Sequence, residues 1–434
     1  MTGFCLQSHF ADAMGALLGP DFPDTIGLAV SGGGDSMAML TLAHNWTHQY
    51  GVTLRVVTVD HGLRAESADE AEFVARTCAE LGHSHSTLRW QGPSGPGWDG
   101  HGNLQDAARA ARLSLIEDWR GSLRHVLMAH TADDQAETFL MRLARGSGVD
   151  GLASIPEKRF VPSGPQAADR DAADSGFWLI RPLLNARRAD LRHYLTVLKG
   201  TWVDDPSNDD PKYDRVRMRQ AMDLLQPLGL DVPTLAQTAT RMARARDGLQ
   251  RWAQDAAADL VRAQYGDLLY DRDALAALDA ETRLRLLAVG LQYVAVQPYR
   301  PRAQALEATA ERVLSGGHGT LHGCMIRAEK TDIRICREYR AVAATTAQVG
   351  DIWDQRVRIQ GPKIAGMTVR ALGAEGAAQL DQRPAGLPYQ SLIAQPAVFE
   401  RDRLHAFAPA GYGPAHTTDY FAGQGSFPNF IRMH

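Results

Sequence analysis

The sequence predicts an α/β fold whose N-terminal part is a doubly wound parallel sheet. Two observations lead to this prediction. Short apolar runs alternate with helical patterns between residues 26 and 130, and three of these runs end directly in polar residues. Such alternation favours a parallel sheet with helices on both faces, and ligands bind beyond the carboxyl ends of its strands. A helical middle domain and a small mixed α/β C-terminal domain are expected to follow.

The first apolar run is followed by a glycine-rich turn and a helix. Residues 26–30 (IGLAV) predict a short buried strand, and residues 37–42 (MAMLTL) begin a buried helical pattern that covers about 35–50. Glycine lets the backbone pass close to a ligand, and the first amides of a helix are unpaired and partly positive. We therefore expect an anion site, most simply for phosphate, in the turn between them. The turn consists of Ser31, Gly32, Gly33, Gly34, Asp35 and Ser36.

Asp35 gives this turn a further property. The turn contains no lysine, so it is not the common GxxxxGK[ST] phosphate loop. A carboxylate beside phosphate needs a cation between them, and Mg²⁺ favours carboxylate and phosphate oxygens together. Asp35 is therefore predicted to help hold Mg²⁺; the alternative is a helix N-cap, which is a common role for Asp.

The second apolar run, residues 54–59 (LRVVTV), ends at Asp60 and His61 and precedes a helical pattern over about 66–82. Since the carboxyl ends of parallel strands share one edge, these two residues are expected on the same edge as the glycine turn. There they could face a ribose or an adenine. The alternative is an ordinary pair of turn residues.

The third apolar run, residues 126–129 (VLMA), ends at His130. A helix is predicted to begin after it, with Thr131 as its cap and Asp134 three residues later. A histidine at a strand end can contact substrate or move a proton, so His130 and Asp134 are the preferred functional pair. Asp133 alone carries little weight, because acidic residues are favoured in a first helical turn regardless of function.

Arg109 and Arg112 lie on one face of the helical pattern over about 103–119. They could stabilise phosphate or the charge that develops in a transition state. An ordinary exposed pair on a helix is an equally good interpretation from this helix alone.

Composition limits the class of protein. A chain of 434 residues is expected to form two or three domains, and its 44% hydrophobic and 22% charged residues are typical of a soluble globular protein. No apolar run approaches the length of a membrane span, and no secretory signal is recognisable. The four scattered cysteines argue against a zinc ribbon or a disulfide framework and fit a cytoplasmic location. With a net charge of −4, any RNA contact must use local basic patches.

The turn sequence SGGGDS resembles the SGGxDS signature of the PP-loop ATP pyrophosphatases, which have a Rossmann-like sheet. Several further segments, in order, resemble the tRNA(Ile)-lysidine synthases. They are VDHGLR (59–64), NLQDAARAAR (103–112), HTADDQAET (130–138), RGSGVDGLASIP (145–156), RPLL (181–184) and WVDDPSNDD (202–210). One departure is Val216, which replaces an asparagine in the family's RNxxR segment, while Arg215, Arg217 and Arg219 supply arginines there. Weaker similarity continues through residues 316–338, 352–359 and 369–373.

This resemblance implies an ATP- and Mg²⁺-dependent reaction with free L-lysine and a CAU-anticodon tRNA(Ile). ATP would adenylate the C2 oxygen of the wobble cytidine, and the ε-amine of lysine would then displace AMP and leave lysidine. The implied catalytic residues are Asp35, His130, Asp134, Arg109 and Arg112. The implied ATP site comprises residues 31–36 with Asp60 and His61, and Arg215, Arg217 and Arg219 are implied tRNA contacts. Asp134 or Asp60 could face the lysine ammonium, and His130 or Asp134 could accept its proton.

The expected domains are a catalytic domain (1–220), a helical basic middle domain (221–345) and a small C-terminal domain (346–434), the last two contacting tRNA. A tRNA thiolase of the same fold is the nearest alternative, but Cys78 is expected in a helix core and no cysteine cluster is present. A GMP synthetase would also contain an amidotransferase domain or an ammonia tunnel, and nothing in the sequence suggests either. A non-catalytic nucleotide-dependent RNA-binding protein is the alternative from another class. The lysine-binding residues, the rejection of elongator methionine tRNA and the oligomeric state, with a homodimer as one option, are left open.

Overall fold

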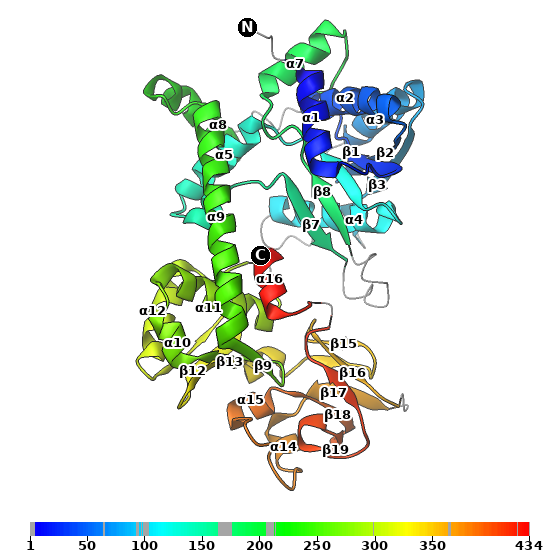
Figure 1. Cartoon of the computed structure of the whole chain (residues 1–434). Coiled ribbons are helices and arrows are strands. Elements are labelled where there is room, and N and C mark those ends of the chain that lie inside the picture. The colour runs from blue at the N-terminus through cyan, green and yellow to red at the C-terminus, as the bar shows by residue number, and fades with distance from the viewer. Residues whose placement is uncertain are drawn as a thin grey trace. The chain divides into compact units, whose positions relative to one another are not determined.

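A computed structural model describes residues 5–63, 66–92, 95–96, 98, 104–163, 176–204, 212, 214–297, 299–362, 366–422 and 424–433. The chain divides into two compact units, Met1–Arg246 and Asp247–His434. The boundary falls inside one long helix, α9 (Val232–Leu260), which is drawn in green in Figure 1. The finer division into three domains at residues 220 and 345 stays a prediction.

The first unit contains a six-stranded sheet with the order β3-β2-β1-β6-β8-β7. Its strands are β1 (Thr25–Ala29), β2 (Thr53–Asp60), β3 (Ser84–Arg89), β6 (His125–Met128), β7 (Lys158–Pro162) and β8 (Gly176–Ile180). All neighbouring pairs are parallel except β7 with β8. This confirms the predicted parallel sheet and its three predicted strands, to which the structure adds β3, β7 and β8. The strand order reverses between β1 and β6, which is where ligands bind in sheets of this kind.

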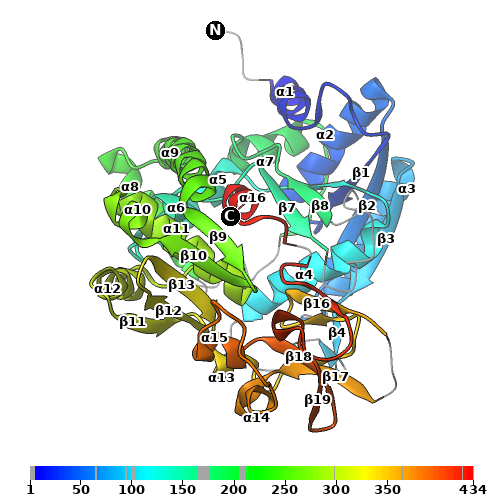
Figure 2. The same ribbon diagram turned by 60° about the horizontal axis from the view of Figure 1, so that its bottom comes forward.

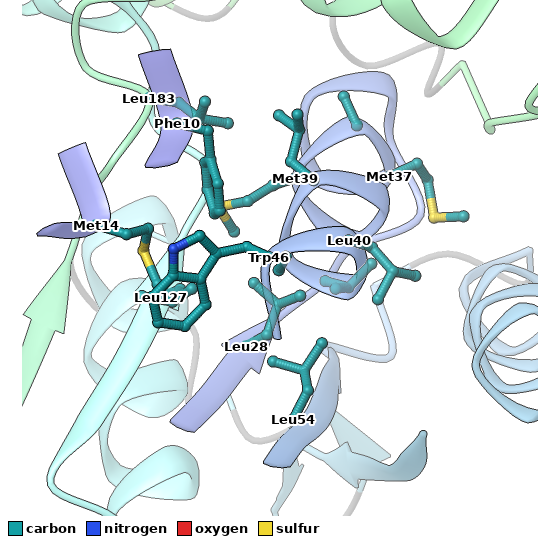
Figure 3. Close-up of a cluster of buried hydrophobic side chains, with 14 of the residues drawn as sticks. Phe10, Met14, Leu28, Met37, Met39, Leu40, Trp46, Leu54, Leu127 and Leu183 are labelled. Atoms are coloured by element: carbon teal, nitrogen blue, oxygen red, sulfur yellow. The ribbon is translucent and has the colours of Figure 1, made fainter. Parts of the chain in front are cut away.

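Helices cover both faces of this sheet, as the sequence predicts. The helices of the first unit are α1 (Leu6–Leu18), α2 (Gly34–Tyr50), α3 (Ser67–Glu80), α4 (Leu104–Arg120), α5 (Ala132–Leu143), α6 (Val149–Leu152), α7 (Arg188–Val197) and α8 (Asp214–Leu225). Helices α1, α2, α3 and α7 share one apolar core with the sheet, and α4 packs through Ile116 against Val57 and Val126 in another. Figure 3 shows Trp46 of α2 pointing towards Met14 of α1 and Leu127 of β6. This packing fixes α2 over the sheet, and thereby fixes the glycine turn at its N-terminus.

The edge of the first unit beyond β6 is extended by a second group of helices. Ala136 and Phe139 of α5 pack with Met222 of α8 and with Val232 and Leu235 of α9. A 3-10 turn, Gln226–Leu228, joins α8 to α9. This cluster holds the first turn of α5 against the carboxyl end of β6. The position and direction of α5 therefore depend on apolar packing outside the sheet.

The second unit begins with helices and an antiparallel sheet of order β11-β12-β13-β10-β9 (Figure 2). Its strands are β9 (Val261–Gln264), β10 (Asp267–Asp271), β11 (His318–Leu321), β12 (Cys324–Ala328) and β13 (Asp332–Arg337). The helices are α10 (Arg272–Ala277), α11 (Ala280–Ala295) and α12 (Ala303–Leu314). One sheet face buries Tyr270, Ile326 and Ile335 against these helices. The helical part of the prediction is confirmed, and β11 to β13 lie in the segment that resembles the family's middle-domain strands.

The remainder is a small mixed α/β part with two sheets, of orders β14-β17-β18-β19 and β15-β16-β20. Its elements are α13 (Tyr339–Val342), β14 (Thr346–Ala347), β15 (Ile352–Trp353), β16 (Val357–Gln360), β17 (Met367–Ala371), α14 (Gly373–Ala377), α15 (Tyr389–Ile393), β18 (Pro396–Glu400), β19 (Arg403–Ala406), β20 (Thr417–Asp419) and α16 (Phe427–Met433). Trp353 is fully buried in its core. No helix in the described part of the chain is long and apolar enough to cross a membrane.

Candidate active site

The glycine turn lies between β1 and α2 and is closed by its two serines. Ser36 Oγ donates to the Gly33 carbonyl at 2.9 Å and accepts from the Ser31 amide at 3.2 Å. Gly32 has a φ of +88°, a conformation that side chains other than glycine rarely adopt. Gly33 is the N-cap of α2 and supplies no capping side chain, so the first amides of the helix are directed to a ligand or to solvent. The turn therefore has the construction of an anion site.

Asp35 lies in the first turn of α2 and is not its N-cap. Its Oδ2 accepts from Arg188 Nε at 3.0 Å. Its Oδ1 is buried and has no hydrogen-bond partner among the described residues. Burial raises the pKa of Asp35, although the Arg188 guanidinium opposes this shift. An ionised Asp35 therefore has one oxygen available to a further cation.

Arg188, the first residue of α7, gathers the acidic residues of α2 and α5. Its Nη2 donates to Asp134 Oδ1 at 3.3 Å and its Nη1 to Glu137 Oε1 at 3.2 Å. Its backbone amide donates to Asp133 Oδ2 at 2.7 Å. One guanidinium thus contacts three carboxylates, and its backbone contacts a fourth.

Glu137 is a functional candidate that the sequence interpretation missed. It is fully buried, and its Oε1 also accepts from Arg219 Nε at 3.1 Å. Its Oε2 is buried without a hydrogen-bond partner among the described residues. The signal was present, because Glu137 is the glutamate of the HTADDQAET segment and lies three residues after Asp134, on the same side of α5. Arg188, which follows RPLL, gave no comparable signal.

The start of α5 confirms the predicted cap. Thr131 Oγ1 accepts from the Asp134 amide, and Asp134 Oδ2 accepts from the Thr131 amide at 2.8 Å, which forms a capping box. Burial would raise the pKa of Asp134, but Arg188, His130, the Thr131 amide and Arg215 together outweigh it and the pKa is lowered. Asp134 is therefore held as a carboxylate in a fixed orientation.

His130 lies among arginines from several elements. Burial, followed by the charge of Arg181, lowers its pKa to about 3, and Arg215 and Arg109 act in the same direction. Burial also lowers the pKa of Arg112, with Arg109 and Arg215 as further causes. His130 is therefore a neutral imidazole at ordinary pH. The sequence-predicted Arg109, Arg112 and Arg215 meet here, on α4 and α8.

Asp60 and His61 follow β2 on the same sheet edge. Asp60 Oδ1 accepts from the Gly62 amide at 2.8 Å and from Ser67 Oγ at 2.7 Å, so this oxygen organises the turn into α3. Burial, and then the charge of Arg112, lower the pKa of His61 to about 4. His61 therefore belongs to the arginine-rich side of the site. Asp60 thus organises this turn, as in the alternative interpretation, and a contact of Asp60 and His61 with ribose or adenine stays a prediction.

The three arginines of α8 have different surroundings. Arg215 influences His130 and Asp134, Arg219 contacts Glu137, and Arg217 is paired with Asp214. Val216 is buried, so the position at which the family has an asparagine faces the core. Arg64, Asn103 and residues 205–210 of the family-like segments lie outside the described residues.

Comparisons with known proteins identify the family. A family model described as a PP-loop domain matches residues 6–225. A tRNA(Ile)-lysidine synthase of Ruegeria pomeroyi is 41% identical over 95% of both chains. The chain belongs to the tRNA(Ile)-lysidine synthase family. A family member from Hyphomonas neptunium is 38% identical and covers 75% of this chain and 85% of its own.

Membership of the tRNA(Ile)-lysidine synthase family settles the choice among PP-loop enzymes. Cys78 is fully buried, and burial raises its pKa to about 11, so it is not a reactive thiol. Among solved structures, a U34-tRNA thiolase from Methanococcus maripaludis has a TM-score of 0.44 and 17% identity, covering 56% of this chain and 78% of its own.

Proposed function

We propose that this protein joins free L-lysine to C2 of the wobble cytidine of CAU-anticodon tRNA(Ile), consuming ATP and forming lysidine, AMP and pyrophosphate. One observation carries the proposal. The glycine turn, the β2 and β6 ends and the acidic helix α5 meet at one sheet edge, in a chain that is similar over 95% of its length to a protein named tRNA(Ile)-lysidine synthase. The reaction then has two steps on one cytidine.

In the first step, the C2 oxygen attacks the α-phosphorus of ATP and the bond to pyrophosphate breaks. The turn over residues 31–36 and the start of α2 would bind the phosphates through backbone amides. Asp35 Oδ1 fits a magnesium ion, since it is a buried carboxylate oxygen without a partner among the described residues. Mg²⁺, when bound, neutralises phosphate charge. Arg109 and Arg112 would stabilise the charge on the α-phosphate.

In the second step, the ε-nitrogen of lysine attacks C2, the bond from C2 to the AMP oxygen breaks, and the nitrogen loses protons. Of the two predicted ammonium partners, Asp134 is favoured over Asp60, because Asp134 shares Arg188 with the carboxylates Asp35 and Glu137, whereas Asp60 organises the turn into α3. Glu137 supplies a further carboxylate next to Asp134. A free ammonium would thus be recognised by the acidic side of the site.

His130 is the proposed proton acceptor of the second step. Its pKa is about 3 in the free protein because burial and nearby arginine charge disfavour its protonated form. The phosphates of ATP bring negative charge to the same arginines, which raises the pKa of His130 once nucleotide is bound. His130 would therefore be a stronger base in the nucleotide-bound complex, in which it accepts the proton. Asp134, whose pKa is also lowered, is the weaker candidate.

Contacts with tRNA are proposed for α8 and the second unit. Between residues 283 and 340 the chain has ten basic and five acidic residues. Arg334 and Arg337 are bonded to Asp267 and Asp354, so the basic residues available to RNA phosphates are fewer than the count suggests. Arg215 and Arg217 are the proposed contacts on α8, and Arg219 contributes through Glu137. We further propose a cytoplasmic location. We also propose a homodimer, which light scattering of the purified protein would test.

The proposal is tested by incorporation of labelled lysine into a CAU-anticodon tRNA(Ile) transcript with ATP and Mg²⁺. Wild type should incorporate lysine, and Asp35→Ala should lose activity. A transcript that carries uridine at the wobble position serves as the substrate control and should accept no lysine. Absence of incorporation by the wild type, with ATP consumed on another RNA, would refute the lysidine assignment and leave the adenylating site standing.

A further inference from the structure

The guanidinium of Arg188 binds carboxylates from two helices that are distant in sequence. Asp35 of α2 is 153 residues away and contacts Nε, whereas Asp134 and Glu137 of α5 contact Nη2 and Nη1. Each guanidinium nitrogen thus faces a different carboxylate. The side chain is 18% exposed and the Glu137 side chain 1%. This is the arrangement of a shared counter-ion rather than of a single ion pair.

The charge balance of the cluster depends on Arg188. A buried carboxylate is stable only when it is paired, because desolvation disfavours its charge. Burial lowers the pKa of Arg188, but Asp134, Asp35 and Glu137 outweigh it and the pKa is raised. The two other cations beside the cluster are more exposed: Arg187 lies 3.5 Å from Asp133, and Arg219 contacts Glu137. Arg188 alone touches both α2 and α5 carboxylates in the described part of the chain.

The cluster retains capacity for further cations. Asp35 Oδ1 and Glu137 Oε2 are both buried and lack hydrogen-bond partners among the described residues. Buried carboxylate oxygens of this kind call for an explanation, and a ligand that is absent from the free protein is one. The reaction under the proposed function brings two cations to this place, a divalent metal with ATP and the ammonium of lysine. The inference below rests on that function.

We propose that Arg188 is a positioning residue that stands in for the substrate cations until the nucleotide binds. Asp35 would then hold the metal that accompanies ATP and release Arg188 Nε, while Arg188 Nη1 and Nη2 would keep Glu137 and Asp134 in place for the lysine ammonium. A free divalent cation cannot displace the guanidinium by itself, because it would leave Arg188 without one of its three carboxylates. Metal therefore enters together with ATP, whose phosphates supply the missing negative charge.

The test measures binding of Mn²⁺ to the nucleotide-free full chain, with the free ion followed by electron paramagnetic resonance. Arg188→Met removes the resident cation and keeps the carboxylates. It should bind Mn²⁺ at least about tenfold more tightly than wild type, since a cation within about 4 Å of the metal's ligands is removed. Loss of packing or folding would weaken metal binding, so a gain cannot come from damage to the structure.

The matched control is Arg187→Met, which removes the neighbouring arginine. Arg187 Nε lies 3.5 Å from Asp133 Oδ2, and the Arg187 side chain is 40% exposed. This variant should bind Mn²⁺ as wild type does. The double variant Arg188→Met with Asp35→Asn should lose the gain, because Asp35 is the metal ligand. Equal Mn²⁺ affinity in Arg188→Met and Arg187→Met, with both folded, would overturn the proposal.

Arg188→Lys keeps the test decisive if the methionine variant does not fold. Lysine retains the charge, but its compact ammonium cannot span three carboxylates as the planar guanidinium does. It should therefore bind Mn²⁺ more tightly than wild type, and an unchanged affinity contradicts the proposal. These measurements use neither tRNA nor lysine. Their failure is thus distinct from a failure of the wild type to incorporate lysine, which would refute the proposed function instead.

Discussion

Replacing Glu137 by glutamine tests the acidic side of the site. The substitution keeps the shape of the side chain and one acceptor for Arg188 and Arg219, and removes one charge. Two unit charges 4 Å apart interact by about 4 kcal/mol at an effective dielectric constant of 20. Because Asp134 still faces the ammonium, we expect lysine binding to lose about half of this interaction energy, or about 2 kcal/mol. The KM for lysine should then rise about 30-fold.

The assay is steady-state lysine incorporation at saturating ATP and tRNA. If Glu137 contributes equally to binding of lysine and of the transition state, KM for lysine rises while kcat changes little. The KM for ATP should not change, because the nucleotide lies against the glycine turn. Glutamine should also lower the unfolding free energy by about 2 kcal/mol, the typical contribution of a hydrogen bond to a charged group.

Glu117→Gln is the matched control. Glu117 accepts from Arg120 Nε at 2.8 Å and from its Nη2 at 2.9 Å, on α4 and away from the acidic cluster. Its loss should destabilise the first unit by a similar amount without raising the KM for lysine. A KM for lysine that is unchanged in Glu137→Gln, or raised equally in both variants, would refute the reasoning.

Three further outcomes are expected. Since the pKa of His130 is about 3 in the nucleotide-free protein, kcat/KM for ATP, which reports that form, should show no loss from its protonation between pH 5 and 8, and an acid limb near pH 6.5 that disappears in His130→Asn would contradict this. Burial raises the pKa of Asp267 to about 6. The stability that Asp267 contributes is therefore present below about pH 4 and is lost as pH rises through 6. Asp267→Asn should flatten this pH dependence of the melting temperature in thermal unfolding. Gly32→Ala meets no atom closer than 3.5 Å, so its cost is backbone strain of about 1–2 kcal/mol, and ATP affinity should fall about tenfold.

The strand ends could be read from the sequence because local signals define them. An apolar run, glycines and a capping threonine are visible within a few residues, and they correctly placed Asp35, His130 and Asp134 on one edge of a parallel sheet. The predicted boundaries of β1, β2 and β6 agree with the structure to within about two residues. These features depend on neighbours in the chain, which is the information that a single sequence contains.

Arg188 and Glu137 escaped because their roles depend on distant contacts. Arg188 reaches Asp35 across 153 residues, and no periodicity or spacing marks an arginine that will bridge two helices. Asp60 shows the opposite case. Its place at a strand end suggested a ligand contact, but the chain turns back there and Ser67 occupies its Oδ1. A polar residue at a strand end is thus a candidate for ligand contact, and the loop that follows the strand determines whether its side chain bonds to the loop instead.

The site is divided by charge, and this division matches the chemistry. On one side, Arg109, Arg112, Arg181 and Arg215 lower the pKa of one another or of His130, and neither Arg112 nor Arg215 forms an ion pair with an acidic residue in the described part of the chain. On the other side, carboxylates share Arg188. Under the proposed function, the glycine turn and these arginines would bind phosphate and the carboxylates around Arg188 an ammonium, so the adenylated cytidine would lie where the two meet. Asp35 belongs to the acidic side but adjoins the glycine turn, so a divalent cation would have to accompany phosphate there.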